Sequence, residues 1–328
     1  MNNKKQIGNS DLWVSPLTFG GNVFGWTVDE QASFKILDDF VGAGFNFIDT
    51  ADTYSRWVPE NKGGESETII GNWLAKNGKR KDVIIATKVG GDVGSGKKDL
   101  SAKHIKEGAE ASLKRLRTDY IDLYQSHYDD VETPVEETMT AFNELIKEGK
   151  VRYIGASNLS GERIKASNDF ARKNNLAGYI SLQPLYNLYD RQKFENEYLK
   201  LVEDESLAVL PYYALASGFL TGKYRSEDDV SKSKRGEGIK KKYLNERGWK
   251  ILSAMDKAAE EKNVQLSQIA IAWLLHKSFI TSAIASATSK KQLSELTEAT
   301  TLKLSDEQIN KLDNASAWQF GKEEKLVH

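Results

Sequence analysis

Short apolar runs alternate with amphipathic segments along nearly the whole chain. Runs rich in β-branched and aromatic residues, which favour strands, occur at 13–19, 45–48, 83–88, 120–125, 151–155, 179–183, 207–213 and 280–287. Apolar residues at helical i, i+3, i+4 spacing occur between them at 29–41, 104–116, 134–147, 160–173 and 266–276. Such alternation favours a parallel sheet with right-handed crossovers. We therefore predict an α/β fold, a (β/α)8 TIM barrel.

Helix signals are clearest at 134–147. Thr133 is a candidate N-cap, Pro134 suits the first helical position, and Gly149 suits the end of the same helix.

The length of 328 residues allows two domains, but barrels of this kind often reach this size as one domain. Because no low-complexity linker divides the chain, we predict a single domain over 1–328. Irregular insertions at 54–64 and 224–242 follow strand ends, where loops at a barrel mouth determine specificity. We expect a flexible mouth loop at 224–242, with disorder of its distal half as the alternative, and a C-terminal tail after about residue 316.

Composition excludes several classes of function. Lys plus Arg number 46 against 47 Asp plus Glu, a formal net charge of −1, which argues against a nucleic-acid partner. The absence of cysteine excludes disulfides, thiolate nucleophiles and cysteine metal sites, and we find no His/Asp/Glu cluster with metal-ligand spacing. No apolar stretch approaches the ~18 residues of a membrane span, and the start of the chain lacks the apolar region of a signal peptide. We expect a cytoplasmic protein.

Four polar residues stand where apolar runs end, namely Asp49, Tyr54, Lys88 and His127. In a barrel of parallel strands the carboxyl ends converge on one mouth, so these side chains could share a pocket suited to proton transfer. Each has an ordinary structural interpretation: a helix cap for Asp49, a half-buried loop aromatic for Tyr54, a strand-end lysine reaching solvent for Lys88 and a satisfied near-core histidine for His127. Four such accidents at successive strand ends are improbable together, which favours a catalytic site.

Several short motifs occur in a fixed order. FIDTADTY at 47–54 matches an Asp/Tyr signature, ATK at 86–88 a lysine strand, and QSH at 125–127 a histidine strand. Further matches are GASN at 155–158, LQP at 182–184, YYALA at 212–216, LTGKY at 220–224 and QLSE at 292–295. Between about residues 10 and 312 the chain thus resembles the aldo-keto reductase family. The resemblance implies reduction of an aldehyde or ketone to an alcohol, with NADP(H) as cofactor and a small carbonyl compound as substrate.

The resemblance gives each of the four polar residues a role. Hydride delivery to a carbonyl carbon builds negative charge on oxygen, so a proton donor must face that oxygen. Tyr54 is expected to be this acid, and the base in oxidation. A free tyrosine has a pKa near ~10, and we expect Lys88 to lower it while Asp49 keeps Lys88 charged. His127 would orient the carbonyl.

Cofactor and substrate contacts also follow from the resemblance. Ser157, Asn158 and Gln183 would bond the nicotinamide carboxamide, Tyr212 would stack on the ring, and the small residues at 215–218 with Lys223 would surround the pyrophosphate. The full set of expected cofactor contacts is Asn22, Asp49, Ser157, Asn158, Gln183, Tyr212, Tyr213, Ala214, Leu215, Ala216, Ser217, Lys223, Ser286, Thr288, Gln292 and Glu295. The expected substrate contacts are Phe24, Trp26, Trp57 and Tyr128.

Cofactor preference depends on the segment after the last strand. Ser286 and Gln292 occupy positions where many members of the family have Lys and Arg. Hydroxyl donors, the positive end of a helix starting near Ser289, and Lys290 and Lys291 could still bind a 2′-phosphate. We therefore expect NADPH to be preferred over NADH, by a smaller factor than in members with the full basic set.

Two alternatives need weighing. The segment GDVGSGK at 91–97 fits G-x-x-x-x-G-K, but Lys98 follows where a phosphate-binding loop needs Ser or Thr; a polar loop at the mouth is the favoured interpretation, with Asp99 to Ser101 capping a later helix. The other alternative is a regulatory or sensor subunit that binds a nicotinamide cofactor and turns over slowly, since relatives of this fold serve ion channels. His127 favours an enzyme, because a sensor does not need it.

Overall fold

The computed structural model describes residues 4–94 and 96–318. Its centre is a sheet of eight parallel strands in the order β10-β3-β4-β5-β6-β7-β8-β9. The strands are β3 (Leu17–Gly20), β4 (Phe47–Asp49), β5 (Ile84–Val89), β6 (Ile121–Ser126), β7 (Val151–Ser157), β8 (Tyr179–Gln183), β9 (Ala208–Val209) and β10 (Ala283–Ala285). Each expected apolar run overlaps one of these strands, and five of the strands extend one or two residues beyond the run.

The sheet closes into a barrel. β10 pairs with β3 through Ala283 and Leu17. At the other end, Val209 in β9 forms a parallel bridge with Ile280, and the amide of Thr281 donates to the carbonyl of Val209 at 2.9 Å. The predicted (β/α)8 barrel and single domain are confirmed.

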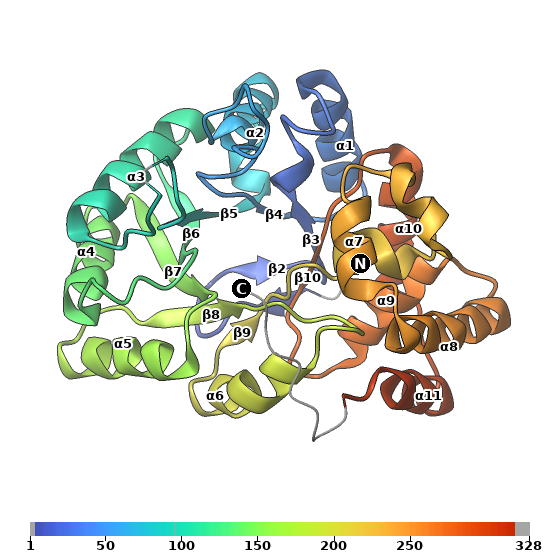
Figure 1. The fold of residues 1–328 in the computed structure, drawn as a ribbon. Helices are drawn as coiled ribbons and strands as arrows, with labels where there is room; N and C mark the ends of the chain where they lie inside the picture. The colour runs from blue at the N-terminus through green and yellow to red at the C-terminus, as the bar shows by residue number, and fades with distance from the viewer. Residues whose placement is uncertain (1–3, 95, 319–328) are drawn as a thin grey trace.

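Helices surround the barrel, as Figure 1 shows for the successive blue to green elements α1 to α5. The helices are α1 (Glu30–Gly42), α2 (Glu65–Asn77), α3 (Ala102–Leu116), α4 (Val135–Lys147), α5 (Gly161–Lys173), α6 (Leu199–Asp204), α7 (Gly236–Tyr243), α8 (Glu246–Lys262), α9 (Leu266–His276), α10 (Lys290–Ala299) and α11 (Asp306–Ser316). Short helical turns are η1 (Gly21–Val23), η2 (Arg80–Asp82), η3 (Phe194–Tyr198), η4 (Ala216–Thr221) and η5 (Glu227–Lys232).

Side-chain caps begin several helices where the sequence indicated them. Ser101 accepts a hydrogen bond from the amide of His104 at the start of α3, and Ser289 caps α10 in the same way. The prediction for α4 was wrong by one residue: Pro134 is the N-cap, and the Thr133 hydroxyl bonds Oδ2 of Asp130 at 2.6 Å instead. The neighbouring carboxylate competes successfully for the threonine hydroxyl.

A short antiparallel hairpin lies at the N-terminal end of the barrel. It consists of β1 (Lys5–Gln6) and β2 (Trp13–Val14). Residues 13–14 were expected to start the first barrel strand, but they pair with β1 instead, and β3 begins only at Leu17. Ile7 and Val14 are fully buried against barrel residues that include Phe47. The hairpin therefore covers the end of the barrel opposite the carboxyl ends of the strands.

The insertion at 224–242 contains more regular structure than a plain loop. It forms η5, which has a Ser226–Asp229 capping box, and most of α7. Tyr224 and Tyr243 are buried at its two ends and anchor it to the barrel. Its flexibility stays a prediction, and residues 319–328, most of the predicted tail, lie outside the described residues.

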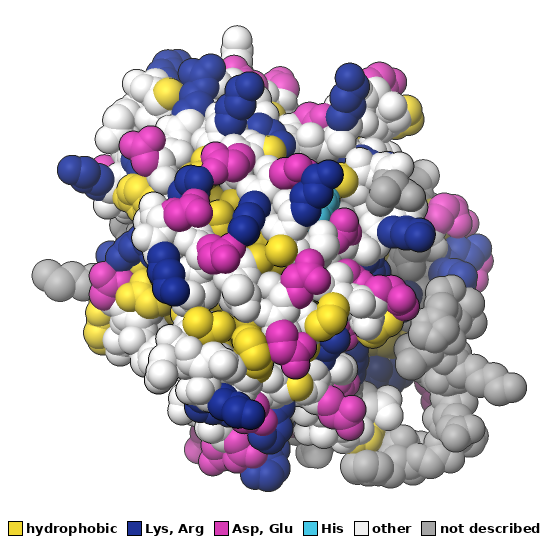
Figure 2. Space-filling view, turned by 90° about the vertical axis from the view of Figure 1, so that its left-hand side faces the viewer, with side chains coloured by type: hydrophobic (Ala, Val, Ile, Leu, Met, Phe, Trp, Pro, Cys, Tyr) yellow, Lys and Arg dark blue, Asp and Glu magenta, His cyan; other side chains and the backbone are white. Residues whose placement is uncertain are grey.

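Charged side chains of both signs are intermixed on the outer surface. Figure 2 shows this on the face formed by α3, α4 and α5, where basic and acidic side chains are interspersed with each other and with apolar ones. The pattern agrees with the near-zero formal charge. None of the helices within the described residues is both long and apolar enough to span a membrane.

Candidate active site

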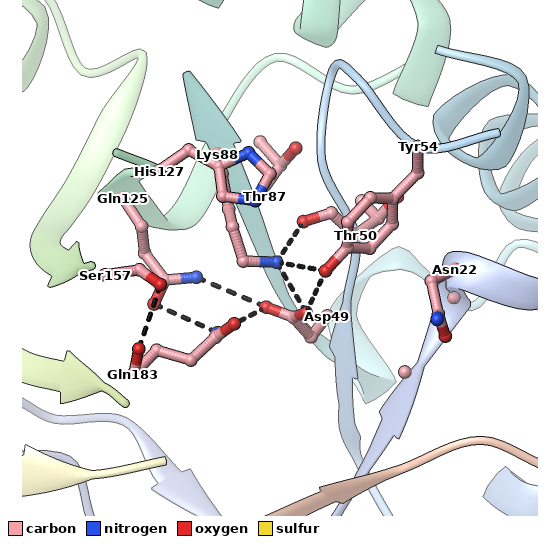
Figure 3. A network of polar contacts seen from close by, with 12 residues as sticks. Asn22, Asp49, Thr50, Tyr54, Thr87, Lys88, Gln125, His127, Ser157 and Gln183 are labelled. Carbon is pink, nitrogen blue, oxygen red and sulfur yellow. Dashed lines mark hydrogen bonds and ion pairs between the residues drawn. The ribbon is translucent and has the colours of Figure 1, made fainter. Parts of the chain in front are cut away.

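The carboxyl ends of neighbouring strands bring the four predicted residues together. Asp49 is the last residue of β4, Lys88 lies near the end of β5, and His127 directly follows β6. Parallel pairing places Asp49 beside Ala86 and Lys88 beside Gln125. Tyr54 returns to the same place from the loop after β4, so that its hydroxyl meets Lys88 and Asp49 (Figure 3).

The ammonium group of Lys88 is completely buried and uses all three of its protons. It donates to Oδ2 of Asp49 at 2.6 Å, to the carbonyl oxygen of Thr50 at 2.8 Å and to the hydroxyl oxygen of Tyr54 at 2.8 Å. Burial lowers the pKa of Lys88 and the charge of Asp49 opposes that change. The ion pair with Asp49 offsets the unfavourable burial of both charges.

The second carboxylate oxygen of Asp49 is bonded as well. Oδ1 accepts from Nε2 of Gln183 at 2.8 Å and from Nε2 of Gln125 at 3.2 Å. Asp49 thus connects the ends of β4, β5, β6 and β8 through side chains. Gln125 was not predicted as a site residue, although it lies in the QSH motif.

The hydroxyl of Tyr54 has an electrostatic environment different from the expected one. It accepts from Lys88 and donates to Oδ2 of Asp49 at 3.3 Å. Burial, followed by the negative charge of Asp49, raises the pKa of Tyr54 well above its usual value. The net shift is opposite to the predicted lowering, because burial and the negative charge of Asp49 outweigh the ammonium group of Lys88 that donates to the same oxygen.

His127 is held by its backbone and by its neighbours. Its amide donates to the carbonyl of Val89 at 2.8 Å, and its carbonyl accepts from Nδ2 of Asn158 at 3.0 Å. The imidazole stacks on the ring of Tyr128 at 4.5 Å and lies 6.0 Å from the Tyr54 ring, centroid to centroid. Burial, and then the positive charge of Lys88, lower the pKa of His127 well below its usual value. The ring is therefore neutral near pH 7.

A further group of buried charges lies behind Lys88. Glu67 in α2 is fully buried and accepts from the Thr87 hydroxyl at 2.5 Å and from Nε of Arg115 at 2.6 Å. Asp52 is 7% exposed, and its Oδ1 has no hydrogen-bond partner among the described residues. Burial and the charge of Glu67 raise the pKa of Asp52 to about 8. Asp52 is therefore protonated at neutral pH.

A cavity of about 1190 Å³ opens over these residues. Its wall contains Tyr54 and His127 of the predicted catalytic set, and most of the predicted cofactor and substrate contacts. These are Asn22, Trp26, Trp57, Tyr128, Ser157, Asn158, Gln183, Tyr212, Tyr213, Ala214, Leu215, Ser217, Lys223, Ser286, Thr288, Gln292 and Glu295.

Four predicted residues are not on this wall. Asp49 and Lys88 lie directly behind Tyr54, where they contact its hydroxyl. Ala216 is fully buried in the core. Phe24 is also fully buried, with its ring stacked on Phe19 at 5.2 Å, so it cannot contact a substrate. The chain turns through η1 after β3, which directs Phe24 inward.

The polar groups at the ends of β7 and β8 are bonded to one another. The Ser157 hydroxyl donates to the carbonyl of Gln183 at 2.9 Å, and Oδ1 of Asn158 accepts from the Tyr212 hydroxyl at 2.8 Å. Asn158, Tyr213 and Ser217 have φ values of 54°, 55° and 59°, in the left-handed region. Such backbone strain gathers at binding sites.

The far end of the cavity lies between β3 and α10. The Ser286 hydroxyl lies 2.7 Å from both the carbonyl oxygen of Gly20 and Oδ1 of Asn22. A Cβ at Gly20 would come within 2.8 Å of that hydroxyl, so a larger residue there would displace Ser286 from its present contacts. The two lysines of α10 differ: Lys291 lines the cavity, whereas Lys290 is turned toward Asp39 at 3.2 Å and is highly exposed.

Several cavity residues come from mouth segments whose conformation the sequence does not specify. They are Thr53, Arg56, Lys98, Lys232, Lys234 and Arg235. Arg235 lies over the ring of Trp26 at 4.9 Å, and Trp26 packs edge to face on Trp57 at 5.5 Å. Thr53 lies within the FIDTADTY motif, whereas no motif match includes Arg56, Lys232, Lys234 or Arg235.

The segment 91–97, which resembles a phosphate-binding loop in sequence, is a loop organised around Asp92. Oδ1 of Asp92 accepts from the amides of Gly94 at 2.8 Å and Gly96 at 2.9 Å, so an aspartate occupies the centre of the loop. Such a centre repels phosphate. Residue 95 lies outside the described residues. Within the described ranges, no three His, Cys, Asp or Glu side chains are placed to hold a metal ion.

Comparison with known proteins agrees with this geometry. Residues 16–317 match the model of the Aldo/keto reductase family. A probable voltage-gated potassium channel subunit beta of Arabidopsis thaliana is 36% identical over 298 residues, 89% of either chain. An uncharacterized oxidoreductase of Bacillus subtilis (strain 168) is 34% identical over 316 residues, 94% of either chain. Norsolorinic acid reductase of Aspergillus flavus is 32% identical over 323 residues, 94% of this chain and 79% of the relative.

Proposed function

The chain belongs to the aldo/keto reductase family of oxidoreductases, and we propose that it reduces an aldehyde or ketone to an alcohol with NADPH, using Tyr54 as the proton donor. One observation supports this assignment above all. The Lys88 ammonium is bonded at once to the Asp49 carboxylate and the Tyr54 hydroxyl, beneath a large cavity. Any buried acceptor would satisfy the third proton of Lys88, but the acceptor here is a tyrosine hydroxyl on the wall of the cavity, where a ligand can reach it.

The cavity suits a nicotinamide cofactor. At one end of the cavity, Ser157 offers a hydroxyl group and Asn158 an amide group, and Tyr212 offers an aromatic face beside them. Gly218 has a φ of 103°, and a Cβ there would lie 3.5 Å from Nζ of Lys223, so backbone and ammonium can approach a pyrophosphate together. When bound, the cofactor supplies the hydride. Lys291 and the N-terminus of α10 support a preference for the 2′-phosphate of NADPH.

Each polar residue then has a defined part in the reduction. The raised pKa of Tyr54 keeps its phenol protonated, as a proton donor requires. Turning the hydroxyl from Asp49 toward the carbonyl oxygen makes the proton available. Lys88 already donates to the tyrosine oxygen and stabilises the phenolate that remains. Neutral His127 provides a second hydrogen bond to the substrate oxygen.

The test is a panel of aldehydes and ketones assayed with NADPH, in wild type and Tyr54→Phe. We expect the variant to lose on the order of 10²-fold or more in kcat, with the dissociation constant of NADPH unchanged. Tyr153→Phe is the matched control, since Tyr153 lies at the opposite end of the barrel, beside Asp11, and should keep full activity. More than a third of wild-type activity in Tyr54→Phe would exclude Tyr54 as the donor.

A second function deserves a test because a relative is named as a probable channel subunit beta. A regulatory or sensor subunit would bind the same cofactor and turn over slowly. Single-turnover oxidation of bound NADPH by an aldehyde distinguishes the two functions. Rapid repeated turnover supports the enzyme, whereas one slow turnover with tight retention of the cofactor supports the sensor.

A further inference from the structure

Thr53 lies beside the imidazole of His127, on the loop that also holds Tyr54. Its hydroxyl oxygen is 3.4 Å from Nδ1 of His127, and it lines the same cavity. Among the described residues this is the sole hydrogen-bond contact of either ring nitrogen. The distance is long, but hydrogen bonds at catalytic sites without ligand are often long and tighten when substrate binds.

Gly91 makes room for this contact. It follows β5 and opens the segment that resembles a phosphate-binding loop. A Cβ at Gly91 would come within 2.7 Å of Cγ2 of Thr53 and 3.4 Å of Nδ1 of His127. No positive φ accounts for a glycine at this position, so the close approach of the two side chains is its evident reason.

The direction of this hydrogen bond determines what His127 can do. A neutral imidazole has one protonated nitrogen and one acceptor nitrogen, and a hydrogen bond to one nitrogen selects the state of the other. If the Thr53 hydroxyl donates to Nδ1, then Nε2 is protonated and can donate to a carbonyl oxygen. In the opposite tautomer Nε2 would present a lone pair, which repels that oxygen.

The hydroxyl of Thr53 makes no other side-chain hydrogen bond within the described residues. Donation to Nδ1 therefore gives its proton an acceptor within the protein, while acceptance from Nδ1 would leave that proton to solvent in the cavity. The lowered pKa of His127 agrees with a neutral ring.

We propose that Thr53 is a positioning residue that holds His127 in the tautomer protonated on Nε2, ready to donate to the substrate carbonyl. This inference rests on the proposed carbonyl reduction for its consequence in turnover. The tautomer itself exists without substrate, and can be observed directly.

The kinetic test compares Thr53→Val, which keeps the shape and removes the hydroxyl, with Thr53→Ser, which keeps the hydroxyl. We expect Thr53→Val to lose about tenfold in kcat, as for one hydrogen bond, with the dissociation constant of NADPH unchanged. Thr53→Ser should stay within about threefold of wild type. Gly91→Ala displaces Thr53 from the other side and should lower kcat in the same direction, which keeps the test valid if Thr53→Val folds poorly.

The spectroscopic test uses protein labelled with 15N at histidine. The chain has 4 histidines, and His127→Gln identifies the signals of His127 by their loss. We expect a protonated Nε2 and an unprotonated Nδ1 in wild type and Thr53→Ser, and a mixture of tautomers in Thr53→Val. A protonated Nδ1 in wild type, or the same tautomer in wild type and Thr53→Val, would overturn the inference. If wild type reduces no carbonyl compound, the proposed function fails while the tautomer is still measured.

Discussion

Asp52 is a buried acid that stays protonated beside the candidate active site. It lies in the same loop as Tyr54, yet one of its carboxylate oxygens has no partner within the described residues, and its pKa is about 8. The group of charges behind Lys88 includes Glu67 and Arg115, which neutralise each other. A third buried acid has no cation left to it, so it keeps its proton.

This has a consequence for stability against pH. The unfolded chain releases the Asp52 proton near pH 3.8, whereas the folded chain keeps it until about pH 8. Stability attributable to Asp52 is therefore lost as pH rises between these values, by about 1.4 kcal/mol for each unit of pKa difference. We expect Asp52→Asn to raise the Tm relative to wild type by roughly 2 °C or more at pH 9, and by less at pH 5. Thermal melts at both pH values check this, and equal differences would contradict it.

The positions of some site residues could be predicted from the sequence, and those of others could not. Asp49, Lys88 and His127 were predictable because strand ends of a parallel barrel converge, and the structure brings them together. Phe24 was misplaced because η1 turns the chain between strand and loop. The direction of the Tyr54 pKa shift was predicted wrongly because it depends first on burial of the hydroxyl and then on the charge of Asp49, and the sequence shows neither the burial nor the contact.

At the scale of elements, the sequence indicates a strand better than it indicates the strand's partner. Trp13 and Val14 do form a strand, but one that pairs with β1 outside the barrel. Helices α8 and α11, which pack on each other, were not predicted at all. Their apolar residues follow a helical period, but they come after the charged mouth insertion, where no strand separates them from their neighbours.

The hairpin permits a test of whether the N-terminal end of the barrel contributes to stability without contributing to turnover. Ile7 follows β1 and is fully buried against barrel residues far from the mouth. We expect Ile7→Ala to destabilise the fold by about 2–5 kcal/mol while kcat stays within about twofold of wild type. Val131→Ala is the control, because this side chain is 76% exposed. Urea unfolding and steady-state kinetics on the same samples measure both effects, and a matching fall in kcat would contradict the prediction.

Helix α10 permits a paired test of cofactor preference. Lys291 faces the cavity, while Lys290 contacts Asp39 on α1. We expect Lys291→Ala to reduce the ratio of NADPH to NADH affinity by roughly three- to tenfold, as for one charge-assisted contact, and Lys290→Ala to leave it unchanged. Quenching of tryptophan fluorescence gives the dissociation constants. If neither substitution changes the ratio, we infer that the hydroxyls of Ser286 and Thr288 and the N-terminus of α10 determine the preference for the 2′-phosphate.

Contacts between residues distant in sequence close the barrel and form its cavity. The cavity wall includes residues from Gly20 on β3 to Leu296 on α10, and the two ends of the sheet meet at Val209 and Ile280. A ligand that fills this cavity contacts both halves of the chain at once. Its binding free energy therefore opposes unfolding of the entire barrel.

Added NADPH should consequently stabilise the protein by mass action. At a concentration 100 times its dissociation constant, the gain is about 2.7 kcal/mol. NADH at the same concentration should raise the Tm by less, in keeping with the proposed preference. Thermal melts across a series of concentrations of each cofactor measure this, and equal rises would argue against discrimination at the 2′-phosphate.

The hydrogen bonds around Asp49 join four strand ends without using any residue from 56–62 or 226–235. Those two stretches instead supply Trp57 and Arg235 to the cavity wall. If Tyr54 is the proton donor as proposed, the reaction and the choice of substrate depend on different segments of the chain. We therefore expect substitutions confined to the two stretches to change the preferred substrate while leaving the hydrogen bonds around Asp49 unaltered.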